Sequence, residues 1–365
     1  MRESLRRQLR ITWHLPAVLL VLFAIAAGAA SFNWLTSPRP RVVRLTGTHY
    51  EIGLQHGRLL RAEIRALWNG YVVHGLAEKE HHSVADLVAA ARHYDHLIPQ
   101  PLREEMRGIA DGAEVPYDEI VVINTFADAM LGGQRFCSAL AVNGNDGLLI
   151  GRNLDWTDHD VAHRSGVVFI LEPKGERRVM SVGWPGMVGV VTGMNDRGLT
   201  VTMNIAFASD VETEAMPSLI RIRDALDHET TVDGAVARAT STPRTMAMNW
   251  MVADSRRAVV VEMSGHRAAT RPMEGVCEVT TNYYESLPIA GGSGGDRSAT
   301  LRRAFASGTA TVGQIERALL RVAFFGGAHG INTIQSVVFD PKQLAAHVAI
   351  GKLPAPSGRF YRVAM

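Results

Sequence analysis

The residues best suited to chemistry in this sequence surround one cysteine. Cys137 opens an apolar run at residues 138–142, and a second run at 147–154 follows the turn residues Asn-Gly-Asn-Asp-Gly. Two β-rich runs joined by a short turn predict a β-hairpin. With a turn of two or three residues, paired positions sum to about 290 or 291. Cys137 is therefore expected opposite Asn153 or Leu154.

Two charged residues flank that pairing point. Arg152 and Asp155 would bring a guanidinium and a carboxylate within side-chain reach of the thiol, which is the setting of an activated cysteine nucleophile. Strict strand alternation places these two residues on opposite faces, so we expect a strand end or a bulge to reconcile them. Ala139 and Ala141 alternate with Cys137, and their small side chains are expected to leave room for a substrate.

The elements that must position these residues change in character near residue 135. Before it, helical periodicity predicts packed amphipathic helices over 51–73, 83–98, 102–113 and 117–131. After it, strands are predicted over 138–142, 147–154, 166–172, 178–183, 187–193, 199–204, 248–253, 257–263, 276–281 and 333–339. Further helices are predicted over 218–229, 232–240, 298–306 and 312–323. Strands in hairpin order with interposed helices favour an α+β fold of two antiparallel sheets covered by helices.

Composition excludes several classes of protein. The chain has 365 residues, of which 47% are hydrophobic and 20% charged, with 2 Cys, so disorder and a disulfide scaffold are excluded. The net charge is +2, but residues 1–36 alone carry +3, which leaves the remainder at −1. A basic surface that binds nucleic acid is therefore disfavoured.

The first 36 residues predict a targeting segment. Arg2, Arg6, Arg7 and Arg10 precede an apolar run of 21 residues, Leu15–Leu35, which is long enough to cross a bilayer. The small residues near Ala29 are also typical of a signal-peptidase site. A cleaved signal peptide and an uncleaved membrane anchor at residues 15–35 both remain open. In either case the body of the protein is expected to be exported, to a periplasmic or other extracytoplasmic location.

The hairpin, four later segments and one earlier segment together resemble a known family. Cys137 with Arg152 and Asp155 resembles the N-terminal nucleophile (Ntn) hydrolases of the penicillin acyltransferase (C45-like), choloylglycine hydrolase and acid ceramidase group. The supporting segments are Gly193–Asn204, Thr281-Asn282-Tyr283, Asp296-Arg297, Asn332–Pro341 and Gly53-Leu-Gln-His-Gly57. Tyr283 departs from the pattern, because many relatives carry His there.

This resemblance implies a fold and a maturation step. The fold expected is the Ntn αββα four-layer sandwich of two antiparallel sheets, preceded by a helical segment and by the leader or transmembrane helix. Cleavage before Cys137 would divide the chain into a leader at 1–36, a helical pro-segment (the α chain) at 37–136 and a catalytic β chain at 137–365. The two fragments of one precursor would then be partners.

The same resemblance assigns roles to six residues. Cleavage of the Phe136–Cys137 bond gives Cys137 a free α-amine, whose ordinary pKa of about 7.7 to 8.0 suits a general base near neutral pH. Asp155 would bind the amine and Arg152 would favour the thiolate. Asn204, through its backbone N–H, and the Asn282 amide would hold the oxyanion. Arg297 would orient the site or the substrate.

The expected reaction is hydrolysis, or acyl transfer, of a linear non-peptide amide through an acyl-thioester on Cys137. The substrate would be a small acyl amide with an apolar acyl chain. Two alternatives remain open. An inactive relative could serve as a membrane-tethered binding protein with the same fold, and Cys137 with His329 and Asn332 imitates the residue order of a papain-like cysteine protease.

No cofactor and no metal are expected. His81, His82, His93 and His96 lack ligand spacing and are interpreted as residues of a solvated helical face. Cys277 has no charged motif beside it and is interpreted as a core residue.

Overall fold

The computed structural model describes residues 34–129, 136–289, 295–327 and 330–365. The predicted leader at 1–36 lies almost wholly outside the described residues. Within the part of the chain that is described, no helix is both long enough and apolar enough to cross a membrane. Export and anchoring therefore stay predictions.

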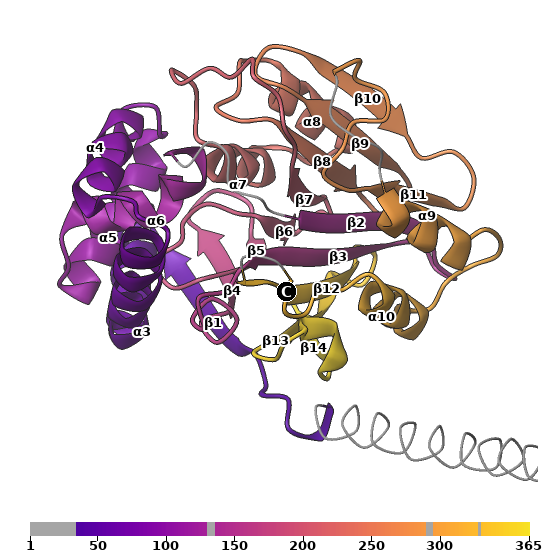
Figure 1. The fold of residues 1–365 in the computed structure, drawn as a ribbon, viewed down its shortest axis with the longest axis horizontal. Coiled ribbons are helices and arrows are strands. Elements are labelled where there is room, and N and C mark those ends of the chain that lie inside the picture. Colours follow the sequence, from indigo (N-terminus) through magenta and orange to yellow (C-terminus); the bar gives the residue numbers. More distant parts are fainter. Residues whose placement is uncertain (1–33, 130–135, 290–294, 328–329) are drawn as a thin grey trace, which may run out of the picture.

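Two β-sheets form the centre of the fold (Figure 1). The larger sheet has eight strands, in the spatial order β1 (Arg41–Gly47), β4 (Val167–Pro173), β5 (Val179–Gly183), β6 (Thr192–Asn195), β7 (Thr200–Ile205), β8 (Met248–Ala253), β9 (Ala258–Met263) and β10 (Ala268–Pro272). The smaller sheet has six, in the order β11 (Cys277–Thr280), β2 (Phe136–Asn143), β3 (Leu148–Thr157), β12 (Ile331–Asp340), β13 (Ala345–Ile350) and β14 (Tyr361–Ala364).

The prediction of two antiparallel sheets is wrong for one strand. β1 belongs to the segment predicted to be helical, and it pairs in parallel with β4 along its whole length. Val43 and Leu45 are buried while Arg44 and Thr46 are exposed. This alternation is the ordinary signature of a strand with one covered face. The larger sheet is therefore mixed, and the N-terminal segment supplies its edge.

The helices follow the predicted periodicity closely. Before the hairpin they are α2 (His49–Leu59), α3 (Arg61–Leu67), the π-helix η1 (Trp68–Lys79), α4 (Val84–Asp95), α5 (Gln100–Ala113) and α6 (Tyr117–Ala129). After it they are α7 (Ser218–His228), α8 (Val232–Thr240), α9 (Gly295–Ala304), α10 (Val312–Arg321) and the short 3₁₀-helix η3 (Ala355–Ser357).

Three apolar clusters hold the layers together. One joins the N-terminal helices, α7 and α8 to the outer face of the larger sheet. The second lies between the sheets, where Ala139 and Ile150 of the smaller sheet meet Val168 and Met251 of the larger. The third covers the opposite face of the smaller sheet with α9 and α10. The predicted pair of sheets covered by helices is confirmed, and Figure 1 shows the N-terminal helices gathered at one side.

Glycines bring α2 and α5 into backbone contact. A Cβ atom at Gly53 would lie 2.0 Å from the Glu105 carbonyl oxygen, and one at Gly57 would lie 2.3 Å from that of Ile109. Only glycine allows two helices to cross at this distance. The close crossing fixes the position of α2, on which His56 lies.

Candidate active site

The predicted hairpin is formed by β2 and β3. Cys137 lies opposite Leu154, so that paired positions sum to 291. This is one of the two registers that the turn length predicts. Phe136 lies opposite Asp155, and Ala139 lies opposite Arg152. The hairpin therefore places Asp155 one pair and Arg152 two pairs from the pair that contains the nucleophile.

The two charged residues lie on opposite faces of the sheet. Residues opposite one another in a ladder share a face, so Arg152 and Leu154 are on the face of Cys137 while Asp155 is on the other. Of the two expected ways to reconcile them, a bulge in the hairpin is wrong, whereas Cys137 does lie at a strand end, as the second residue of β2. The pairing of β2 with β3 is regular, and the register shift lies instead in β12, between Thr333 and Gln335.

Polar side chains hold the backbone of Cys137 on both sides. The Cys137 N–H donates to Asn282 Oδ1 at 2.7 Å, and Arg297 Nη1 donates to the Cys137 carbonyl at 2.8 Å. The same guanidinium reaches Asn282 Oδ1 at 3.0 Å, Ser138 Oγ at 3.1 Å and Asp155 Oδ2 at 3.4 Å. We call this set of five residues the cradle. Although α9 begins far along the chain, it brings Arg297 to the start of β2.

Asp155 is a buried carboxyl group of the cradle. Burial raises its pKa to about 6, while a hydrogen bond from Thr333 and the guanidinium groups of Arg297 and Arg152 oppose that shift. Thr333 Oγ1 donates to Asp155 Oδ1 at 2.5 Å. Because the pKa lies close to neutral pH, Asp155 can change its charge in the range where a cysteine enzyme works.

Arg152 is fully buried without a carboxylate partner in hydrogen-bond contact. Its Nη1 donates to Asn204 Oδ1, and Asn204 Nδ2 donates to the Thr280 carbonyl at 3.0 Å. Nε and Nη2 of Arg152 have no hydrogen-bond partner among the described residues. A buried guanidinium with free donors on the face of the thiol can stabilise a thiolate or a bound anionic group. The oxyanion role of the Asn204 backbone N–H stays a prediction.

The structure places Asn282 differently from the expectation. Its Nδ2 donates to the Ile205 carbonyl at 2.7 Å, and its Oδ1 faces the nitrogen of Cys137. An oxyanion needs a donor, whereas here the acceptor end of the amide contacts the nucleophile. The reason is that the buried peptide N–H of the intact chain requires an acceptor.

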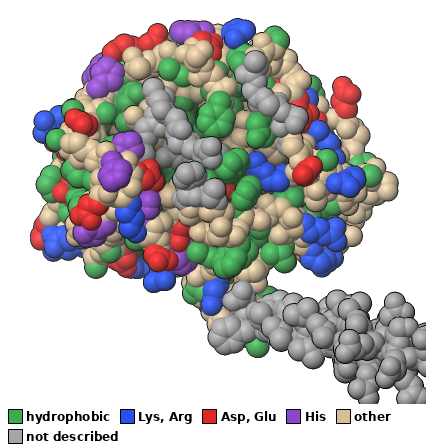
Figure 2. Space-filling view, in the orientation of Figure 1, with side chains coloured by type: hydrophobic (Ala, Val, Ile, Leu, Met, Phe, Trp, Pro, Cys, Tyr) green, Lys and Arg blue, Asp and Glu red, His purple; other side chains and the backbone are tan. Residues whose placement is uncertain are grey.

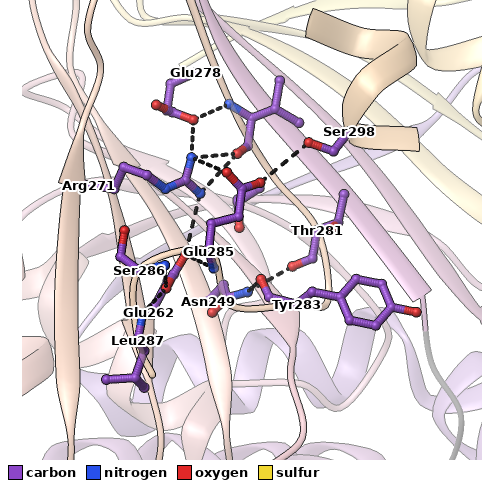
Figure 3. Close-up of polar contacts among 12 residues, drawn as sticks. Asn249, Glu262, Arg271, Glu278, Thr281, Tyr283, Glu285, Ser286, Leu287 and Ser298 are labelled. Carbon is purple, nitrogen blue, oxygen red and sulfur yellow. Dashed lines mark hydrogen bonds and ion pairs between the residues drawn. The ribbon is translucent and has the colours of Figure 1, made fainter. Parts of the chain in front are cut away.

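A second polar network fixes the loop that carries Asn282 (Figure 3). Asn249 donates to the carbonyls of Thr281 at 3.0 Å and Tyr283 at 2.9 Å. Buried Glu262 accepts the backbone N–H groups of residues 285–287 at 2.7 to 2.8 Å. Arg271 links Glu262 to the neighbouring Glu278 and Glu285. Residues of β8 and β9 thus hold Asn282 against Cys137.

An apolar pocket lies beside the cradle. It holds about 30 Å³ of space for the centres of water-sized molecules, within about 400 Å³ of empty volume that includes the solvent at its mouth. Its lining residues from the N-terminal helices are Leu67, Tyr71, Val72, Ile123 and Phe126. Those from later segments are Trp156, Ala162, Trp184 and Met187.

The pocket begins close to the nucleophile, at a residue of β3 two positions beyond the one that pairs with Cys137. Trp156 follows Leu154 by two residues on β3, so both lie on the face of Cys137. Two expectations need correction. Ala139 and Ala141 leave no space for a substrate, because they pack between the sheets. Trp184 and Met187, interpreted as core residues, line the pocket instead.

Sequence reasoning missed several residues of this site. The sequence predicts Thr333 only as part of a strand motif, although it contacts Asp155. It predicts Asn249 and Glu262 only as strand residues. A polar residue within an otherwise apolar strand was the available signal. Phe324, whose ring stacks on Phe136 at 5.1 Å between centroids, carried no signal.

The remaining candidate residues take no part in the proposed chemistry. Asn332 closes its own loop, since its Oδ1 accepts the Gly326 N–H and its Nδ2 donates to the Gly330 carbonyl. His329, its partner in the papain-like alternative, lies outside the described residues. Both cysteines are free thiols, and burial raises the pKa of Cys277 to about 12. Cys277 is only partly buried and packs against the margin of the third apolar cluster, so its predicted place within the core needs correction.

Histidines gather at the surface over the N-terminal helices (Figure 2). His93 and His96 both contact Glu214, and His82 contacts Glu80. All four predicted histidines are exposed, but of these only His93 lies within a helix, because His81 and His82 precede α4 and His96 follows it. Within the described ranges, no group of three or more metal-ligating side chains is found.

Sequence comparison connects this site with a family. Residues 142–300 match the model of the family described as acyl-coenzyme A:6-aminopenicillanic acid acyl-transferase. An uncharacterized protein of Archaeoglobus fulgidus is 27% identical over 271 residues, which cover 64% of this chain and 45% of that protein. The 40 kDa form of acyl-coenzyme A:6-aminopenicillanic-acid-acyltransferase from Emericella nidulans is 28% identical over 193 residues, or 51% of this chain and 52% of that protein.

Among solved structures, an N-acylethanolamine-hydrolyzing acid amidase ortholog from Caenorhabditis elegans aligns with a TM-score of 0.47 and 19% identity, over 56% of this chain and 92% of that one. The chain spans about half the length of the curated relatives it matches.

These matches show that the chain is similar to the penicillin acyltransferase family over residues 142–300, a segment that begins at the end of the first strand of the hairpin.

Proposed function

We propose that the chain is an autoprocessed cysteine amidase or acyltransferase whose nucleophile is the Cys137 thiol. One observation carries the proposal: the peptide unit of Cys137 is held at its N–H by Asn282 and at its carbonyl by Arg297, at the start of a buried strand. The nitrogen is one end of the bond that maturation would break, and the carbonyl fixes the same residue on its other side. A structural cysteine within a strand needs no such pair of side chains, because the ladder alone satisfies its backbone.

Maturation begins with attack of the Cys137 sulfur on the Phe136 carbonyl carbon. The carbon–sulfur bond forms, the carbon–nitrogen bond breaks, and the thiol proton goes to the departing nitrogen, which becomes the α-amine. Water then hydrolyses the thioester to a Phe136 carboxylate and a free thiol. Asn282 Oδ1 already contacts the nitrogen that becomes the amine, so it can hold that amine as it accepts the proton.

The mature site would use the same residues on external amides. The α-amine takes the thiol proton, the thiolate attacks the acyl carbon, and the amine returns the proton to the leaving nitrogen. From its position beside Arg297, the Asp155 carboxylate favours the protonated form of the amine. Arg152 lies on the face of the thiol and favours the thiolate form of Cys137. Water as acceptor gives hydrolysis, and an amine or thiol gives acyl transfer.

The pocket supports an apolar acyl group as the substrate class. Its lining is apolar and aromatic, and its lining residue Trp156 lies on the same face of the sheet as Cys137, beyond Leu154. A linear acyl amide with its chain in this pocket would present its carbonyl to the thiol. The relative from Emericella nidulans is named as an acyltransferase that uses an acyl thioester, which supports the reaction class. Export of the protein, inferred from the leader, belongs to the same proposal.

Mass spectrometry of the purified full chain tests the processing step. We expect a fragment that begins at Cys137 and ends at Met365, and we expect the Cys137→Ala variant to stay intact. Cys277→Ala is the matched control, because it removes the other free thiol and should process normally. An active preparation in which Phe136 and Cys137 remain joined would overturn the proposal.

Amine release from acetyl, octanoyl and palmitoyl amides of one amine tests the reaction. Processed wild type should release amine and Cys137→Ala should not. A processed protein inactive on every amide would instead support a binding protein with the same fold.

A further inference from the structure

One wall of the apolar pocket is a short loop that follows the proposed cleavage site in the sequence. Side chains that come from before that site hold this loop. Residues 184–189, here called the pocket loop, present Trp184 and Met187 to the pocket. The loop turns at Gly186, whose φ of +85° is a conformation that other residues rarely adopt. A loop of this kind takes its position from its partners, so the groups that bind its backbone decide the shape of the wall.

Asn124 of α6 binds the pocket loop with both ends of its amide. Its Oδ1 accepts the N–H groups of Val188 at 2.7 Å and Gly189 at 2.9 Å, and its Nδ2 donates to the Gly186 carbonyl at 3.0 Å. A fourth bond, from Nδ2 to the Ile120 carbonyl at 2.8 Å, ties the amide to its own helix. Asn124 is fully buried. Its neighbours Ile123 and Phe126 line the pocket, so one helix supplies both a wall and the support of the facing wall.

His56 of α2 binds the same loop, also at Gly186. Its Nε2 accepts the Gly186 N–H at 2.9 Å, and its ring lies 4.7 Å from that of Phe169. The side chain is 1% exposed, so water cannot replace it as an acceptor. Asn124 and His56 together engage the N–H and the carbonyl of Gly186, the residue between Trp184 and Met187.

The halves on either side of the Phe136–Cys137 bond share further contacts that cleavage would leave intact. Arg223 of α7 binds Glu105 of α5 through two nitrogens at 3.1 and 3.2 Å, and neither side chain is exposed by more than 1%. β1 pairs with β4 over seven residues. Five of the nine pocket-lining residues precede Cys137. The N-terminal half is therefore built to stay in place and to form part of the pocket.

We propose that Asn124 and His56 are positioning residues that set the acyl-chain selectivity of the pocket by holding the pocket loop. The ligand class is an apolar acyl chain. This inference rests on the proposed function for its catalytic readout. Neither residue contacts the cradle in the structure, so the chemistry at Cys137 does not depend on them.

Steady-state kinetics on acyl amides of one amine separate selectivity from chemistry. For Asn124→Leu we expect the KM of the palmitoyl amide to rise about tenfold, or about 1.4 kcal/mol, because Trp184 and Met187 lose their fixed positions. kcat/KM for the acetyl amide should stay within about twofold of wild type, since uniform binding alone is lost.

Three further variants make the test specific. Thr125→Val is the matched control, because Thr125 is equally buried on the same helix but bonds only to the Val121 carbonyl. His56→Leu should behave like Asn124→Leu, and His56→Gln, which keeps an acceptor, should restore the palmitoyl KM. If Asn124→Leu does not fold, the two His56 variants decide the question. Equal losses on acetyl and palmitoyl amides, or no loss on either, would overturn the proposal.

Binding of cis-parinaric acid, followed by its fluorescence, separates this inference from the proposed function. If wild type releases no amine yet binds the probe, and Asn124→Leu binds it about tenfold more weakly, the positioning role holds and the amidase proposal fails. If wild type does not bind the probe, the positioning role fails whatever the activity.

Discussion

The cradle and the pocket lie next to each other but differ in where their residues come from. Every cradle residue follows the Phe136–Cys137 bond, from Cys137 itself to Arg297. The pocket takes five lining residues from before that bond and four from after it. The difference suggests that one fragment is sufficient for bond breaking and that selection of the acyl group needs both. Changes in the cradle should therefore alter rate, and changes in the pocket should alter preference.

The sharpest test of this division is Asn282→Leu. Loss of the acceptor at the Cys137 nitrogen should slow processing on the order of a hundredfold, the scale of losing one preorganised hydrogen bond at a reacting group. Processing can be followed by electrophoresis of the purified chain over time. Among the molecules that do mature, the ratio of palmitoyl to acetyl turnover should match wild type, and a changed ratio would break the division between cradle and pocket.

The charge of Asp155 gives a second test. Because burial raises its pKa to about 6, the carboxyl is protonated below that pH and loses its attraction for an amine. We expect the processing rate to fall as pH falls through about 6. Asp155→Asn should be about tenfold slower at neutral pH and should lack this acid limb. An acid limb that persists in the variant would assign the titration to another group.

The loop network predicts a smaller effect. In Glu262→Gln, one acceptor oxygen becomes a donor that faces backbone N–H groups, at a cost of about 1 to 3 kcal/mol in the free energy of unfolding. A looser Asn282 loop should lower kcat by severalfold without raising the palmitoyl KM. Urea denaturation and kinetics measure the two effects. A raised palmitoyl KM with unchanged kcat would connect this network to the pocket instead.

The smallest effect is the pH dependence of stability that comes from His56. Burial lowers its pKa from the ordinary 6.5 to about 4. Below 6.5 the unfolded chain takes up a proton that the folded chain does not, so this group costs up to about 1.4 kcal/mol of stability per pH unit as pH falls towards 4. His56→Gln should flatten the dependence in that window. An unchanged slope in thermal unfolding would show that other groups govern it.

Local patterns predict most elements of this fold because they carry periodicity. The helices at 218–228 and 232–240 begin and end within a residue of their expected bounds. The hairpin register follows from turn length alone. The sequence does not predict β10, because Ala268–Pro272 alternates only between partly and fully exposed residues and has no apolar face. β13 and β14 were likewise not predicted.

The site was predicted as a set of residues but not as an arrangement. Arg152 and Asp155 were both expected near the thiol, yet which face each occupies depends on the regularity of the hairpin. The direction of the Asn282 amide depends on the Ile205 carbonyl, which another strand supplies. Such tertiary contacts leave no local periodicity. The support of the pocket loop by Asn124 was invisible for the same reason.

The glycine crossing of α2 and α5 has a consequence for how this protein can diverge from its relatives. His56 lies between Gly53 and Gly57, and a methyl group at Gly57 would meet the Ile109 carbonyl and push the helix outward. The imidazole would then withdraw from the pocket loop. If the pocket loop sets acyl selectivity as proposed, the distance between the two helical backbones sets it as well, and one substitution at Gly57 would change it without altering Cys137.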